Sequence, residues 1–188
     1  MSRPSTIVQQ ADRDQRFDPL FRAHHDAIWR YCLRRLGPSD ADDAAADVFA
    51  VVWRRLDEMP TGEASRAWLY GVAYRVVGSH YRSRRRQTRL TARLDASTRG
   101  EGHQLFEPVP SHEVQLLLRA LDGLSPTDRE LLRLSVWEGL TRDEIAYVLG
   151  IKVNTVDQRL HRARSRLKVR FDRLGSGPAP TEPEEASA

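Results

Sequence analysis

The sequence predicts an all-α protein in which two small helical domains are joined by a flexible linker. Three observations support this prediction. Apolar residues recur at steps of three and four along most of the chain, and no segment alternates as a half-buried strand would. Residues 95–110 lose that periodicity, and two glycines and two prolines gather there. The expected division is an N-terminal extension (1–16), a first domain (17–90), a linker (91–111), a second domain (112–174) and a disordered acidic tail (175–188).

The first domain is expected to contain three helices with identifiable starts. Asp18-Pro19 is typical of an N-cap followed by proline at the first helical position, and Gly37-Pro38 predicts the end of that helix. Ser39 with Asp42 is interpreted as a variant capping box for the second helix, and Ser65 is expected to cap the third. The third helix carries an apolar stripe and runs into an arginine-rich segment, which completes one compact helical unit.

The second domain carries its own helix-start signals. Ser111 is expected to cap one helix, and Ser125-Pro126 combines a capping residue with a proline at the first helical position. Thr141 and Glu144 form a capping box for a short helix, which Gly150 would end in a left-handed conformation. Another helix follows, with apolar residues at an unbroken three/four spacing.

The spacing of Ala146, Gly150 and Val156 is that of a helix-turn-helix. A small residue lets the helices approach, glycine makes the turn, and a branched apolar residue anchors the second helix. The outer face of that helix carries groups that hydrogen-bond base edges and phosphates, namely Asn154, Thr155, Asp157, Gln158, Arg159, His161, Arg162 and Arg166. This pattern predicts DNA binding. Asp157 is expected either to accept from a cytosine amino group or to pair with His161.

The charges of the chain are divided into blocks, although its net charge is only +4. Residues 38–52 contain four acids and no base, whereas residues 82–99 contain seven arginines and one acid. Residues 152–173 contain eight basic residues and two acids. All but two of the basic residues are arginine, whose planar fork suits phosphates and guanine edges, although biased codon composition would give the same excess. The blocks indicate one protein-docking surface and two nucleic-acid surfaces.

Composition and motifs argue against several other classes of protein. No apolar run is long enough to span a membrane, and the N-terminus lacks the apolar stretch of a signal peptide, so a cytoplasmic protein without membrane insertion is expected. The single cysteine, Cys32, excludes a disulfide within the chain and is expected to be a small core residue.

His24-His25-Asp26 invites a metal or acid/base interpretation. Adjacent histidines on one helix diverge by about 100°, so a partly buried or surface histidine is the better account, with His24 on the apolar stripe. The chain has no glycine-rich phosphate loop, no paired catalytic carboxylates and no metal-ligand spacing. We therefore expect no catalysis, no cofactor and no metal.

The sequence resembles the extracytoplasmic-function (ECF) sigma factors of bacterial RNA polymerase, which belong to the sigma-70 family. Their region 4 is similar to SPTDRELLRLSVWEGLTRDEIAYVLGIKVNTVDQRLHRARSRL. Their region 2 is similar to FDPLFRAHHDAIWRYCLRRLG, DADDAAADVFAVVWRRL and RAWLYGVAYRVVGSHYRSRRR. The resemblance covers residues 17–90 and 112–171 in the family's order. It implies a subunit that recruits core polymerase to promoters, recognises the minus-35 and minus-10 elements and assists promoter melting.

The resemblance also implies protein partners. The acidic helix would dock on the clamp-helix coiled coil of the polymerase beta-prime subunit through Asp43, Asp47 and Phe49, and the beta subunit would be a further contact. Ala44 and Ala46 stand where leucine and glutamine are more usual in the family. The family further implies an anti-sigma factor.

The minus-10 element is assigned by the resemblance to the loop before the third helix and to that helix itself. In the family the loop, here residues 59–66, captures a flipped base of the non-template strand. Arg75 stands where asparagine is common, and aromatic and arginine side chains suit stacking on extruded bases. The implied minus-10 residues are Arg66, Tyr74, Arg75, Ser79, His80, Arg82, Arg84, Arg85 and Arg86. The arginine cluster SRRRQTR (83–89) would neutralise phosphates at the junction of duplex and melted DNA.

The minus-35 element would be read by the second helix of the helix-turn-helix, placed in the major groove. Gln158, His161 and Arg162 are expected nearest the bases, with Thr155, Arg159 and Arg166 nearer the backbone. Asp157 stands where the family often has lysine or arginine. Lys152 stands where a capping serine is frequent, so this helix is expected to lack a side-chain cap.

Two other functions remain open from the sequence alone. An autonomous helix-turn-helix regulator would bind duplex DNA by itself, whereas a sigma factor should need core polymerase for specific promoter binding. An interaction protein would use both helical units to bind an inhibitor and not DNA. The arginine-rich faces argue against this last function as the primary one.

Overall fold

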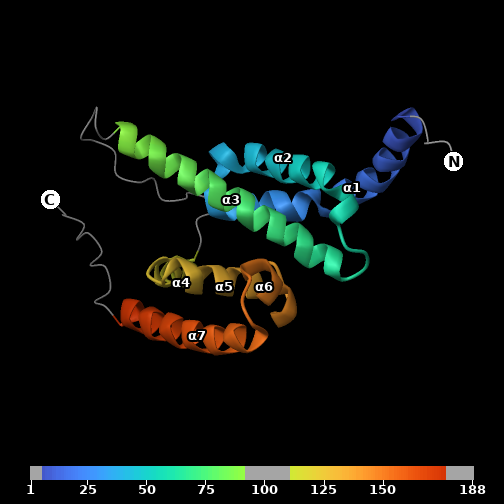
Figure 1. Cartoon of the computed structure of the whole chain (residues 1–188). Coiled ribbons are helices and arrows are strands. Elements are labelled where there is room, and N and C mark those ends of the chain that lie inside the picture. The colour runs from blue at the N-terminus through green and yellow to red at the C-terminus, as the bar shows by residue number, and fades with distance from the viewer. Residues whose placement is uncertain (1–5, 92–110, 177–188) are drawn as a thin grey trace.

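The computed structural model describes residues 6–91 and 111–176, and these ranges contain seven α-helices, one short 3-10 helix and no strand (Figure 1). In chain order the elements are α1 (Thr6–Leu36), α2 (Pro38–Arg54), η1 (Leu56–Glu58), α3 (Ala64–Thr91), α4 (His112–Asp122), α5 (Pro126–Val136), α6 (Arg142–Leu149) and α7 (Val153–Gly175). The all-α prediction is confirmed. Almost all of the expected linker and most of the acidic tail lie outside the described residues.

Helices α1, α2 and α3 form a first helical unit, in which α1 packs along α2 and both pack on α3. The predicted start of α1 at Asp18-Pro19 is wrong, because the helix begins at Thr6 and runs through Pro19. The helical turns before Pro19 are stabilised by contacts with other elements. Arg13 donates to Asp57 and to the carbonyl of Trp53, and Arg16 also donates to Asp57. These contacts to the end of α2 and to η1 hold the extra helical turns in place.

The capping predictions for α2 and α3 are also wrong. Helix α2 begins at Pro38 directly after Gly37, whose φ of 83° suits only glycine, and no side chain caps it. Asp42 instead accepts from the indole of Trp29 at 2.7 Å. Ser65 lies inside α3, and its hydroxyl donates to the carbonyl of Gly62 instead of accepting from the helix.

Helices α4 to α7 form a second helical unit whose predicted caps are confirmed. The Ser111 hydroxyl accepts from the Val114 amide, and Ser125 accepts from the Asp128 amide with Pro126 at the first helical position. Thr141 and Glu144 make both hydrogen bonds of the capping box. Gly150 ends α6 with a φ of 65°, and α7 begins without a side-chain cap, as expected at Lys152. Each of these motifs is local in sequence.

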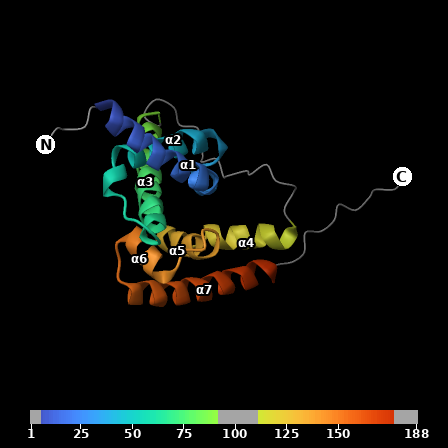
Figure 2. The same cartoon turned by 90° about the vertical axis from the view of Figure 1, so that its right-hand side faces the viewer.

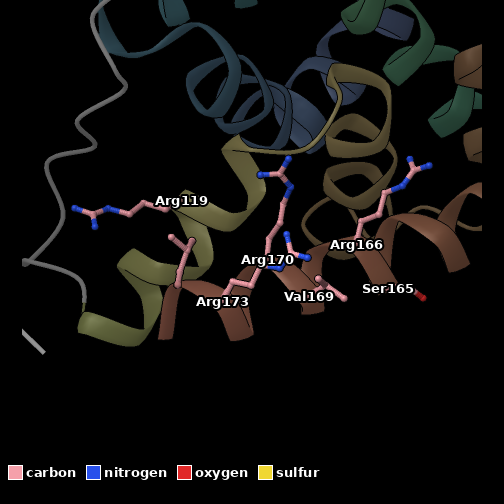
Figure 3. A pocket seen from close by; sticks show the side chains of 7 residues that line it. Arg119, Ser165, Arg166, Val169, Arg170 and Arg173 are labelled. Atoms are coloured by element: carbon pink, nitrogen blue, oxygen red, sulfur yellow. The ribbon is translucent and has the colours of Figure 1, made fainter. Parts of the chain in front are cut away.

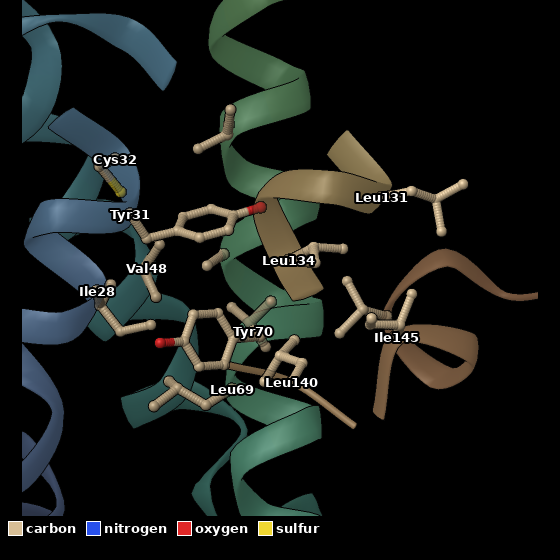
Figure 4. Close-up of a cluster of buried hydrophobic side chains, with 14 of the residues drawn as sticks. Ile28, Tyr31, Cys32, Val48, Leu69, Tyr70, Leu131, Leu134, Leu140 and Ile145 are labelled. Atoms are coloured by element: carbon tan, nitrogen blue, oxygen red, sulfur yellow. The ribbon is translucent and has the colours of Figure 1, made fainter. Parts of the chain in front are cut away.

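The two helical units pack against each other. Helix α3 lies on α6, which is the most extensive contact between the units, and Figure 2 shows α3 running onto α5 and α6. One buried apolar cluster continues from the first unit into the second. Its members near the boundary are Ile28, Tyr31, Leu69 and Tyr70 on one side and Leu131, Leu134, Leu140 and Ile145 on the other (Figure 4). The structure is therefore a closed form in which the two units share a core.

Two predictions about reactive side chains are confirmed by burial. Cys32 is fully buried, and burial raises the pKa of its thiol to about 12, which keeps it protonated at neutral pH. His24 is partly buried, and burial together with the nearby Arg66 lowers its pKa. No helix within the described ranges is both long and apolar enough to cross a membrane.

Candidate nucleic-acid and polymerase interfaces

The helix-turn-helix is formed by α6, the turn at Gly150 and α7. Val156, Leu160 and Ala163 are buried and hold α7 against the rest of the second unit. The opposite face carries the predicted minus-35 residues. Asp157, Gln158, His161, Arg162 and Arg166 are exposed, and Thr155 and Arg159 are partly exposed. The predicted set therefore lies along one solvent-facing side of a 23-residue helix.

Two residues of this face are already engaged within the protein. Asp157 forms an ion pair with Arg142 at the start of α6, and not with His161 as one of the two expectations had it. Arg166 donates to Asp128 at 2.5 Å, where Asp128 is buried in the first turn of α5. Asp157 and Arg166 are thus oriented before any DNA arrives, whereas Gln158, His161 and Arg162 project freely enough to adjust.

The basic face continues along the C-terminal half of α7. A shallow groove between α4 and α7 is lined by Arg119, Ser165, Arg166, Val169, Arg170, Arg173 and Leu174 (Figure 3). Four guanidinium groups border one apolar groove. This arrangement suits an acidic partner or a phosphate backbone more than a neutral ligand.

The predicted minus-10 residues lie along α3 but differ in their availability. Tyr74, Arg75, Ser79, Arg82, Arg85 and Arg86 are exposed. Arg84 is held against the first unit by Asp40 at 2.5 Å and by the carbonyl of Leu36 at 3.1 Å. Arg66 reaches the second unit, where it donates to the carbonyl of Glu138 and lies 3.5 Å from the carboxylate of Glu144. All nine residues lie on α3. Two of them, Arg66 and Arg84, are engaged in the protein contacts just described, and the other seven, His80 included, lie between Tyr74 and Arg86.

The predicted polymerase-docking residues divide in the same way. Asp43 and Asp47 are exposed on α2, and Oδ2 of Asp47 lies 3.0 Å from Nε2 of His80 on α3. Phe49, in contrast, is only 4% exposed and packs against Phe17 and Phe21. Phe49 was expected to contact the polymerase from the surface of α2, but its side chain is buried in the first unit. Its ring supports the helix from beneath, whereas Asp43 and Asp47 lie on the exposed face.

An ion cluster that no sequence pattern predicted joins the two units. It consists of Arg34 and Arg35 of α1, Glu130 of α5 and Glu138 in the turn after α5. Burial alone would lower the pKa of Arg35, but Tyr31, Glu130 and Glu138 outweigh it and raise that pKa. Burial also raises the pKa of Tyr31. No sequence signal marked these residues, because an Arg-Arg pair near a helix end is typical of a solvated surface.

No group of three His, Cys, Asp or Glu side chains suited to a metal ion occurs within the described ranges. The geometry instead presents an acidic helix, an aromatic and basic helix, and a helix-turn-helix with a polar reading face. This combination defines a class of DNA-binding proteins that also dock on a protein partner.

Comparison with protein families identifies the class. Residues 20–87 match Sigma-70 region 2 and residues 114–167 match Sigma-70, region 4. The chain is 30% identical over 178 residues to the RNA polymerase sigma factor CnrH of Cupriavidus metallidurans, covering 88% of this chain and 92% of that one. It is also 30% identical over 158 residues to the ECF RNA polymerase sigma factor SigL of Mycobacterium tuberculosis, covering 83% and 89%.

Solved structures agree with this fold. The structure of CnrH in complex with the cytosolic domain of CnrY has a TM-score of 0.62 at 25% identity, covering 88% of this chain and 94% of that chain. The sigma factor RpoE in complex with the anti-sigma factor NepR from Bartonella quintana has a TM-score of 0.65 at 22% identity, covering 83% and 96%. The chain belongs to the ECF sigma factors of the sigma-70 family. It is an RNA polymerase sigma factor that acts in transcription initiation.

Proposed function

We propose that this sigma factor divides its work among three surfaces: α2 for core polymerase, α3 for the minus-10 element and α7 for the minus-35 element. The observation that carries the proposal is the outer face of α7. There the predicted base-reading residues are exposed along one side of a helix whose other side is anchored by Val156, Leu160 and Ala163. The alternative of an autonomous regulator finds no support in the comparisons, because region 2 is matched as well as region 4.

Helix α7 enters the major groove in this proposal, since a helix with its side chains is about as wide as that groove. Gln158 reads adenine and Arg162 reads guanine, the bases whose edges match their donors and acceptors. Asp157 accepts from a cytosine amino group and is held in place by Arg142. Arg166 lies nearer the phosphates, where its charge contributes regardless of sequence.

Helix α2 docks on a basic surface of core polymerase, which the family resemblance identifies as the beta-prime clamp helices. Asp43 and Asp47 supply the charge, and complementary charge favours rapid encounter and correct orientation. Figure 1 shows α2 on the side of the first unit that faces away from α7, so the second unit does not cover it. The beta subunit is the expected second contact.

Helix α3 and the loop before it engage the melted minus-10 element. Tyr74 offers an exposed aromatic face, and Arg75 lies next to it. Base stacking on aromatic and arginine side chains suits extruded single strands. Arg82, Arg85 and Arg86 follow on the same helix and neutralise phosphates at the edge of the melted region.

An anti-sigma factor is the remaining proposed partner, in the cytoplasm where the polymerase acts. The solved relatives named above were determined in complex with CnrY and with the anti-sigma factor NepR. The arginine-bordered groove between α4 and α7 offers a surface for an acidic segment of such a partner.

Run-off transcription with core polymerase tests the proposal. Asp47→Arg reverses a charge on the docking face and should abolish co-purification with core and the transcript, while circular dichroism stays unchanged. Asp14→Arg reverses an exposed acid on α1, away from that face, and is the matched control. Retention of transcription by Asp47→Arg would refute the assignment of α2. Failure of the wild-type protein to bind core would refute the whole proposal.

A further inference from the structure

The contact between the two helical units is organised around the ion cluster of Arg34, Arg35, Glu130 and Glu138. Nε of Arg35 lies 3.1 Å from each carboxylate oxygen of Glu130, and its Nη1 donates to Glu138 at 3.0 Å. The other oxygen of Glu138 accepts from Arg34 at 2.6 Å. The side chains of Arg35 and Glu138 are each only 2% exposed. The centre of the cluster is therefore sealed from water, whereas Arg34 and Glu130 at its edge are 22% and 14% exposed.

Neighbouring groups orient this cluster from the first unit. The Tyr31 hydroxyl donates to Glu130 at 3.3 Å, and its ring lies 3.4 Å from the guanidinium carbon of Arg35. Arg35 also donates to the carbonyl of Tyr31 at 3.1 Å. A guanidinium held between a ring and two carboxylates is pre-organised for them, so the cluster specifies one geometry of closure.

Apolar contacts surround the cluster and extend the closed interface. Tyr70 of α3 faces Leu134 and Leu140 of the second unit in the shared core (Figure 4). At the next residue of the same helix, Gly71 has no side chain, and the ring of Tyr147 on α6 packs against the helix there. Helix α6 is the first helix of the helix-turn-helix. The helix assigned to the minus-10 element is thus covered along one side by the domain assigned to the minus-35 element.

The closed form is too short to read both elements at once. Elements centred near positions 35 and 10 are separated by about 25 base pairs, which is about 85 Å of duplex at 3.4 Å per step. Helices that share a side-chain core lie about 8–10 Å apart. A promoter can therefore be bound at both elements only after α3 and α6 have separated, and separation exposes the ion cluster.

We propose that the ion cluster is an autoinhibitory clasp, which keeps the free sigma factor closed with its polymerase-docking face exposed and its two promoter-reading surfaces locked together. Core polymerase can then bind α2 before the clasp opens, and a promoter engages both of its elements only in the open form. The proposal rests on the function proposed above. It adds that closure is intrinsic to this chain and requires no inhibitor.

Energy transfer between two dyes on the full chain tests the clasp directly. Ala23→Cys on α1 and Asp172→Cys on α7 provide exposed attachment sites in the two units. Cys32 can remain, because it is buried and its thiol pKa is raised to about 12. The free protein should show high transfer efficiency. The double variant Glu130→Gln/Glu138→Gln keeps the side-chain shapes, removes both charges and should lose most of that transfer.

A matched control changes two exposed acids of the same unit, Glu113→Gln and Asp143→Asn, and should keep wild-type transfer. Circular dichroism verifies that each variant is folded. If the double variant does not fold, Arg34→Ala removes only one arm of the cluster and should give a smaller decrease in transfer. Low transfer in the free wild-type protein would overturn the proposal, and so would unchanged transfer in both the double variant and Arg34→Ala.

DNA binding supplies the functional readout. For DNA that must contact both elements at once, closure reduces the apparent affinity by the fraction of molecules that are open. The double variant should therefore bind a promoter fragment that carries both elements, with the minus-10 element unpaired, at least about fivefold more tightly without core. Equal affinity of wild type and double variant would overturn autoinhibition. Run-off transcription separates the two proposals: a wild-type protein that is closed when free but starts no transcript with core refutes the proposed function and leaves the clasp standing.

Discussion

The ion cluster between the units and the ion pair of Arg142 with Asp157 on the outer face of α7 use the same chemical groups in opposite surroundings. Arg35 and Glu138 are each 2% exposed, whereas Arg142 and Asp157 are 64% and 45% exposed. Water and salt screen the exposed pair, so its net stabilisation is small. The buried groups have lost their hydration and depend on one another. Burial therefore ties Arg35 to the contact between the two units, whereas the exposed Arg142 orients only the side chain of Asp157.

Removal of Arg35 should have the largest effect on stability. Arg35→Ala leaves Glu130 and Glu138 without their main partner, and breaking a buried pair in this way costs about 3–5 kcal/mol of unfolding free energy. Urea unfolding followed by circular dichroism measures the loss. A decrease below about 1 kcal/mol would show that the carboxylates regain water by separation of the units, and would place the cluster with ordinary surface pairs.

Asp128 lies between the two extremes, because its buried carboxylate pairs with the exposed Arg166. Asp128→Asn removes the charge while keeping the shape, and we expect a loss of about 1–2 kcal/mol in unfolding free energy. Thermal unfolding of this variant beside Asp122→Asn, an exposed acid of the same unit, provides the comparison. Equal melting temperatures for the two variants would contradict an effect of burial.

Arg142→Ala should change stability by less than about 0.5 kcal/mol, because its partner Asp157 is exposed. Its effect should appear in specificity instead. Without Arg142, the Asp157 carboxylate is no longer held toward one base, and discrimination at that position should weaken in a binding selection on randomised minus-35 duplexes. An unchanged sequence preference would mean that Asp157 needs no support from α6.

The smallest expected effect is the pH dependence contributed by His24. Burial and the nearby Arg66 lower its pKa, so the folded state favours the neutral ring. Below its ordinary pKa near 6.5 the unfolded chain binds the proton more readily than the folded chain, and stability falls as pH decreases. His24→Gln should flatten the stability profile between pH 7 and 5. A steeper fall of stability with decreasing pH in the variant would contradict a lowered pKa of His24.

The sequence predicts the helix starts of the second unit correctly and those of the first unit wrongly, for a physical reason. The caps at Ser111, Ser125 and Thr141 were found because each hydroxyl accepts from an amide three residues away. The start of α1 was missed because Arg13 and Arg16 bind groups 40 to 44 residues distant. Such contacts leave no periodic or capping signal in the sequence.

The site shows the same limit. Exposure of Asp43, Asp47 and the α7 face followed from helical spacing and charge, because solvated faces alternate with apolar stripes. Phe49 was assigned from the family pattern, and only packing against Phe17 and Phe21 reveals that its ring is internal. Arg35 was overlooked because both of its carboxylate partners lie about a hundred residues away, in the other unit.

Helix α1 joins two distant parts of the molecule and changes direction along its length (Figure 1), as expected of a helix with a proline inside it. Its 31 residues follow a path of about 46 Å at 1.5 Å per residue. Near one end Arg13 and Arg16 hold η1, which leads into the loop before α3, and near the other end Arg34 and Arg35 hold the second unit. The loop before α3 and the contact between the two units therefore share one helix as their support.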